Sequence, residues 1–116
     1  MAEAAGLVTA RLRSAPLGCG FLLGGVDSRG ACLLRVEPDG ASTNSAYASM
    51  GSGQMAAVAT LEASRLGPDA SRSRAIDAVR RAVEAGVRGD TGSGGHVDVV
   101  VVDGAGTERL RFEARR

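Results

Sequence analysis

Lysine and tryptophan are absent from this chain of 116 residues, and aromatic residues are scarce. All 14 basic residues are arginine, which excludes Schiff-base chemistry, a P-loop lysine and a lysine general base on this chain. The net charge is +1, and the only aromatic rings belong to Phe21, Tyr47 and Phe112. Nucleic-acid-binding proteins normally show a basic excess, and single-strand binders add stacking rings. The composition therefore argues against binding to nucleic acid.

Cysteine and histidine are also too few for a structural metal site. Cys19 and Cys32 lie in apolar stretches without metal-ligand spacing, and His96 is the single histidine. We interpret both cysteines as small buried side chains in a reducing compartment, and we expect no metal and no cofactor. No apolar run approaches the length of a membrane helix, and the first residues lack the zones of a signal peptide, so we expect no secretion.

The pattern of apolar residues predicts one domain that contains both helices and strands. Helices are predicted over residues 3–13, 54–65 and 70–88. Strands are predicted over residues 19–26, 31–36, 42–49 (weakly), 97–102 and 108–112. Because strands and helices do not alternate singly, we expect an α+β fold, with a helix layer on a largely antiparallel sheet.

Both central helices have an expected inner side. For helix 54–65, which Gly67 and Pro68 are expected to end, it consists of Met55, Val58, Ala59 and Leu61. For helix 70–88 it is a stripe of Ile76, Val79, Val83 and Val87. Ion pairs four residues apart are expected between Asp77 and Arg81 and between Glu84 and Arg88.

A glycine-rich turn, Met50–Gln54, leads from the third strand into helix 54–65. Its Gly51-Ser52-Gly53 sequence fits a dinucleotide-binding pattern, but that interpretation needs a strand directly after the helix, and a second helix follows. The simpler interpretation is that Ser52 caps the helix while the glycines permit the tight turn.

A second glycine-rich turn, Gly89–Gly95, presents Asp90 and Ser93 three residues apart before the valine strand. Asp90 could simply end the helix, and Ser93 could satisfy a loop amide. However, an acid at a helix C-terminus opposes the helix dipole, which suggests a partner elsewhere, such as an ammonium group or a hydroxyl. We expect His96 to be a surface or strand-edge residue.

Taken together, these segments resemble the beta subunits of the 20S proteasome, members of the N-terminal-nucleophile hydrolases. The resemblance runs from about Leu22 to Phe112 and looks most like the trypsin-like catalytic class, including its immunoproteasome variant. The segments that carry it are Leu23–Asp27, Pro38-Asp39-Gly40, Met50–Gln54, Ala85-Gly86-Val87, and Gly89–Gly95 with Val97-Asp98.

This resemblance implies a four-layer αββα sandwich and a threonine endopeptidase that degrades proteins, cleaving after basic residues. It implies that Ser52, Asp90 and Ser93 support an N-terminal threonine whose own amino group acts as base. It also implies partners, namely other alpha and beta subunits in stacked rings and a polypeptide substrate, and a location in cytoplasm and nucleus.

The sequence departs from the family in its catalytic residues. The family's threonine nucleophile, and the aspartate and lysine that support it, belong to an N-terminal half that these residues do not contain. We therefore expect residues 1–116 to be the C-terminal part of a single beta-subunit domain, lacking the N-terminal half and inactive alone. The alternative is a non-catalytic structural or assembly subunit, in which Ser52, Asp90 and Ser93 are only scaffold.

Overall fold

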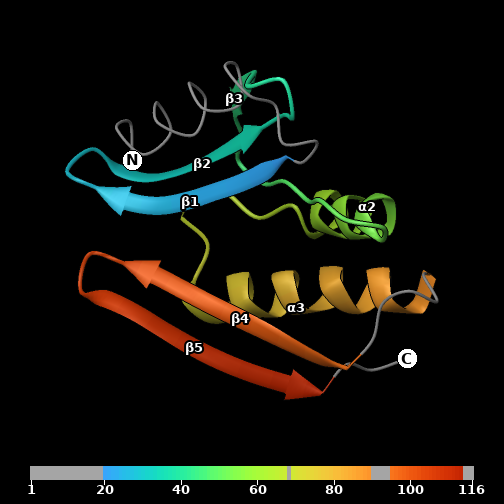
Figure 1. Ribbon diagram of the computed structural model, residues 1–116. Coiled ribbons are helices and arrows are strands. Elements are labelled where there is room, and N and C mark those ends of the chain that lie inside the picture. Colours follow the sequence, from blue (N-terminus) through green and yellow to red (C-terminus); the bar gives the residue numbers. More distant parts are fainter. Residues whose placement is uncertain (1–19, 68, 90–94, 114–116) are drawn as a thin grey trace. The chain divides into compact units, whose positions relative to one another are not determined.

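The computed structural model describes residues 20–67, 69–89 and 95–113. The predicted helix 3–13, Cys19, Pro68, Asp90 and Ser93 lie outside these ranges. In the described part, three strands are followed by two helices and two strands, the predicted order (Figure 1). The chain divides into two compact units. One includes the residues up to Ala48 together with Val102–Ala105, and the other includes Ser49–Val101 and the segment from Gly106 onward.

The first unit contains a three-stranded antiparallel sheet in the order β1-β2-β3. Strand β1 (Phe21–Asp27) pairs with β2 (Gly30–Val36), with Leu23 opposite Leu34. The predicted strand 42–49 is shorter than expected, because β3 covers only Ser42–Asn44. Val36 is fully buried, whereas Cys32 is a half-buried free thiol rather than a fully buried one.

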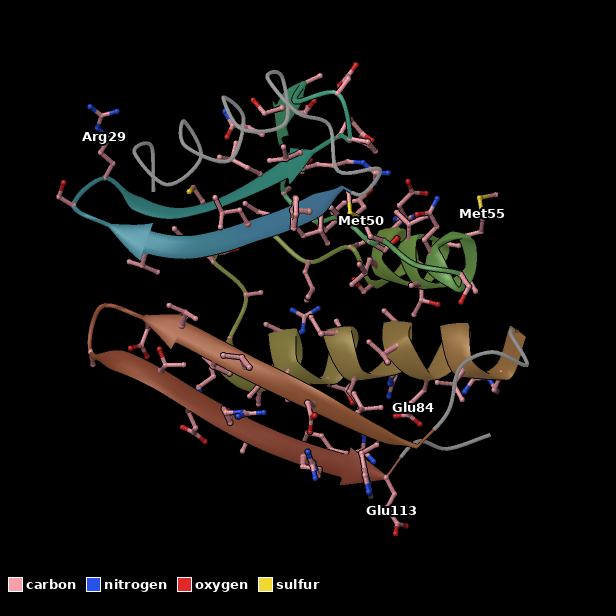
Figure 2. All side chains as sticks on the ribbon, viewed as in Figure 1. Arg29, Met50, Met55, Glu84 and Glu113 are labelled. Atoms are coloured by element: carbon pink, nitrogen blue, oxygen red, sulfur yellow. The ribbon has the colours of Figure 1, made fainter. Side chains whose placement is uncertain are left out.

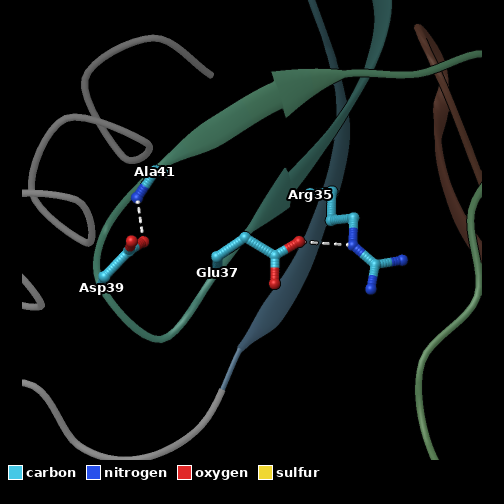
Figure 3. Close-up of polar contacts among 4 residues, drawn as sticks. All are labelled: Arg35, Glu37, Asp39 and Ala41. Atoms are coloured by element: carbon cyan, nitrogen blue, oxygen red, sulfur yellow. Dashed lines mark hydrogen bonds and ion pairs between the residues drawn. The ribbon is translucent and has the colours of Figure 1, made fainter.

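The predicted Pro38-Asp39-Gly40 turn connects β2 to β3 (Figure 3). The Asp39 carboxylate accepts a hydrogen bond from the Ala41 amide at 2.9 Å, which is an Asx turn. Gly40 has a φ of +94°, a conformation that favours glycine. Arg35 Nε donates to Glu37 Oε1 at 2.6 Å. Local side-chain bonds and one glycine therefore fix the return of the chain.

Helix α2 (Gln54–Ser64) matches the predicted helix, but its predicted inner side is partly wrong. Met55 is 77% exposed and Ala59 is exposed, whereas Val58 and Leu61 are half-buried. Because alanines occur on all sides of this helix, its apolar residues do not define a single face. The helix also ends before Gly67, since Arg65 adopts the left-handed conformation at its C-terminus with a φ of 51°.

Helix α3 (Arg72–Gly89) buries a different stripe from the one predicted. Val79 and Val83 are 43% and 40% exposed, Ile76 is half-buried, and of the predicted stripe only Val87 is buried. The buried stripe instead includes Ala78, Ala82 and Gly86, at four-residue steps. Small side chains allow the close approach of a neighbouring helix, so size decides this face more than hydrophobicity does.

Strands β4 (His96–Asp103) and β5 (Gly106–Glu113) form a two-stranded sheet joined by the predicted turn. Val97 and Val99 are buried, while Val100 and Val102 are 52% and 44% exposed, so the apolar strand is covered on one face only. In β5, Leu110 and Phe112 are half-buried between exposed neighbours, as their alternation predicted.

Two side-chain contacts connect α3 to β5. The Arg80 guanidinium lies 4.3 Å from the centre of the Phe112 ring, a cation–π contact. Arg72 forms an ion pair with Glu108. These contacts place α3 against the hairpin, in addition to its packing against α2.

Candidate functional site

The turn before α2 is built from backbone hydrogen bonds rather than from a side-chain cap. Gln54 N–H donates to the Gly51 carbonyl at 3.2 Å, and Gly51 has a φ of +109°. The N-cap residue is Gly53, with no capping side-chain hydrogen bond. The interpretation of Ser52 as the helix cap is therefore wrong. Ser52 is exposed and immediately precedes the cap residue.

The start of α2 lies directly against the last turns of α3. A Cβ built on Gly53 would be 2.8 Å from Gly86 Cα, closer than real atoms allow, so only glycine fits there. One turn further along, a Cβ on Gly89 would be 4.0 Å from Ala56 Cβ, an ordinary contact. Two glycines in direct backbone contact therefore hold the Ser52 turn beside the C-terminal end of α3.

This contact bears on the three predicted site residues. Ser52 immediately precedes Gly53, and Asp90 immediately follows Gly89, the last residue of α3. Asp90 and Ser93 themselves lie outside the described residues. The residue before Asp90 in the sequence thus packs against the helix that begins after Ser52, although the two turns are separated by 35 residues or more.

Where the start of α2 contacts the end of α3, the electrostatics suit an anion at the start of α2. The helix N-terminus carries a partial positive charge, and no acidic residue lies in the first turn of α2. The C-terminus of α3 carries the opposite partial charge, and Arg88 is the basic residue of its last turn. The two helix ends therefore attract one another.

The hairpin has its own ion pair, which sequence reasoning missed. Arg111 donates to both carboxylate oxygens of Asp98, at 2.7 and 3.3 Å. This hydrogen bond, more than the accompanying attraction of Arg111, Arg109 and His96, lowers the pKa of Asp98 below its ordinary value of 3.8. The sequence did contain a signal for this ion pair, because Asp98 and Arg111 lie on neighbouring predicted strands at equal distances in sequence from the turn between them. His96 is exposed at the start of β4, as expected.

Helix α3 confirms one predicted ion pair and corrects the other. Arg81 Nε lies 3.0 Å from Asp77 Oδ2, as predicted. Glu84, which is labelled in Figure 2, is buried. Its Oε1 lies 3.0 Å from Arg80 Nε, so its partner is Arg80 rather than Arg88. Arg80 is favoured because the Phe112 ring fixes its guanidinium on the same side of the helix as Glu84.

The described residues also bear on metal binding and on membrane insertion. In residues 20–67, 69–89 and 95–113, no group of three or more His, Cys, Asp or Glu side chains is arranged to hold a metal ion. Within the same ranges, neither helix combines the length and apolar character needed to cross a bilayer.

Comparison with known proteins gives the family. The family described as "Proteasome subunit" matches residues 2–102. The chain is 39% identical over 95 residues to the probable proteasome subunit beta type-2 of Encephalitozoon cuniculi, covering 82% of this chain and 41% of that protein. It is 40% identical to the proteasome subunit beta type-10 of Bos taurus, covering 82% of this chain and 34% of that protein. It is 38% identical to the proteasome subunit beta 2 of Pyrobaculum neutrophilum, covering 91% and 52%.

The matched segment thus spans about a third to a half of the length of these curated relatives. All three are beta-type subunits, in agreement with the resemblance found in the glycine turns and the valine strand. The match over nearly the whole chain, joined to a mixed helix-and-strand fold in the predicted order, establishes that this chain belongs to the proteasome subunit family, with beta-type relatives.

Proposed function

We propose that this chain is the C-terminal part of a beta-subunit domain of the proteasome core particle, whose whole protein is a threonine endopeptidase that cleaves after basic residues. The observation that carries the proposal is the Gly53–Gly86 backbone contact, which holds the Ser52 turn beside the helix end that leads to Asp90. Glycine destabilises a helix relative to alanine, so a helix contact that only glycine permits indicates that the geometry of the turn matters.

In this proposal, Ser52, Asp90 and Ser93 have supporting roles. The nucleophile is an N-terminal threonine hydroxyl from a part of the protein beyond these residues, and its amino group is the base. The Asp90 carboxylate orients the hydroxyls of Ser93 and the threonine, and Ser52 lies by the ammonium group and relays its proton. The positive end of α2 stabilises the carboxylate that the end of α3 disfavours. No metal or other cofactor has a role.

The exposed face of β4 supports the expected sandwich. Val100 and Val102 together expose an apolar face on a strand whose other face is already covered. In a four-layer αββα architecture, this face would pack against a second sheet. The proposed partners are the other alpha and beta subunits of stacked rings and a polypeptide substrate, in cytoplasm and nucleus.

Residues 1–116 alone should be inactive, because they contain no lysine and the family's mechanism uses one beside the nucleophile. The test is a chimaera in which the corresponding segment of a beta type-2 relative is replaced by this chain. After assembly, cleavage of peptides with arginine at P1 should be inhibited by an epoxyketone. Asp90→Asn should lower kcat by about 10²–10⁴, while Ser28→Ala, in the exposed β1–β2 turn, should leave it unchanged. Assembled particles without such cleavage would contradict the proposal.

The alanine-rich helix α2, none of whose residues is buried, also supports a second candidate, a structural beta subunit without catalysis, because small side chains suit close packing against another subunit. In that case, particles that contain this chain should assemble normally, and a threonine-directed inhibitor should not label the subunit that carries it. Labelling of that subunit would reject the second candidate and favour the first.

A further inference from the structure

Helix α3 carries a regular stripe of charged residues along the groove that it forms with α2. Arg74, Arg81 and Arg88 recur at seven-residue intervals, so they share one face of the helix. Asp77 and Glu84 lie between them on the same face. Two adjoining hollows, of about 510 and 360 Å³, follow this stripe, and Thr60 of α2 lines both.

The arginines of this stripe are not neutralised by its two acids. Glu84 is held by Arg80, which Phe112 fixes in place, so Arg80 is committed to an internal contact. Asp77 meets Arg81, but both side chains are more than half exposed, and such a pair is weak in water. Neither Arg74 nor Arg88 forms an ion pair with any residue in the part of the chain that the structure describes.

We propose that this groove binds an acidic segment of a partner protein, with Arg74, Arg81 and Arg88 each meeting one carboxylate. The charge pattern favours this occupant because Arg74, Arg81 and Arg88 line the groove, only Arg81 of these has an ion-pair partner among the described residues, and that pair is exposed. Guanidinium groups also pair well with carboxylates. The spacing favours a peptide over a small anion. Seven helical residues rise about 10.5 Å, which an extended chain covers in about three residues, so the whole stripe matches about seven residues.

This inference does not depend on the proposed protease function, since none of its residues belongs to the Ser52 and Asp90 turns. The probe is the fluorescently labelled peptide Glu-Gly-Ser-Glu-Gly-Ser-Glu, with the same peptide carrying glutamine for glutamate as its control. The full chain, joined to a carrier protein that keeps it in solution, is titrated into each peptide and anisotropy is measured. The carrier alone is the blank.

The glutamate peptide should bind, the glutamine peptide should not, and affinity should fall steeply between about 50 and about 500 mM salt. Arg74→Gln and Arg88→Gln should each weaken binding about fivefold. Arg109→Gln, which removes an exposed arginine from β5, is the matched control and should have no effect. Arg88→Lys should retain most of the binding, and circular dichroism of each variant should match that of the parent.

Three results would overturn the inference. They are equal binding of the glutamate and glutamine peptides, equal weakening by Arg109→Gln and Arg88→Gln, and tighter binding of an oligothymidylate of the same charge. The first would remove the role of the carboxylates. The second would reduce the effect to net charge, and the third would assign the groove to nucleic acid.

Discussion

Replacing Gly53 by alanine should force α2 away from α3 and destabilise the chain. Gly53 has φ −95° and ψ 13°, which L-residues can adopt, so the backbone itself is not strained by a side chain. The added Cβ, however, would lie 2.8 Å from Gly86 Cα and 3.1 Å from the Gly86 carbonyl atoms. These are backbone atoms inside a helix and cannot rotate away. The two helices must therefore separate.

The size of the effect follows from two opposing terms. Overpacking of this kind costs about 1–3 kcal/mol, and the lower entropy of the unfolded chain returns about 0.4–1 kcal/mol. The net loss should be about 1–2 kcal/mol in the free energy of unfolding. In urea, where the slope for a chain of this size is about 1–2 kcal/mol per M, the midpoint should fall by about 1 M.

Two matched glycines provide the controls in the same assay, urea unfolding followed by far-ultraviolet circular dichroism. A Cβ on Gly86 would be 3.2 Å from the Gly53 carbonyl oxygen, so Gly86→Ala should cost less than Gly53→Ala. A Cβ on Gly89 would make only an ordinary 4.0 Å contact, so Gly89→Ala should be neutral or slightly stabilising. If Gly53→Ala were as stable as Gly89→Ala, the glycine contact would not hold the helices together and the reasoning would fail.

Three further predictions concern the hairpin. Because Arg111 lowers the pKa of Asp98, this pair stabilises the fold above the ordinary aspartate pKa of 3.8 and loses its effect as the pH falls through the lowered value. The urea midpoints of the parent and of Asp98→Asn should therefore converge below about pH 3.8. A gap between the two midpoints that stays constant with pH would contradict this. Val97→Ala, at a side chain that is 1% exposed, should lower the free energy of unfolding by about 2 kcal/mol in the same denaturation assay. Val100→Thr combined with Val102→Thr, on the exposed face, should raise the soluble fraction on centrifugation without lowering stability, and an unchanged fraction would show that this face does not drive aggregation.

The sequence by itself determined the elements of the described chain and their order. Glycine, proline and aspartate mark the turns at Asp39, Gly51 and Gly104, and runs of β-branched or alternating residues mark β4 and β5, because turns and strands depend on local backbone preferences. The family was equally accessible, since the two glycine turns and the valine strand carry it in their order and spacing.

Only the tertiary structure decided which faces are buried and which groups meet. Val79, Val83 and Met55 are apolar yet exposed, while Ala78, Ala82 and Gly86 are buried, because the closest fit between α2 and α3 selects small side chains. Glu84 pairs with Arg80 because a ring on β5 fixes that arginine. Helical spacing in one segment contains no information on the partner that another segment supplies. For the same reason, the meeting of the Ser52 turn with the end of α3 follows from a contact between two glycines 33 positions apart in the chain.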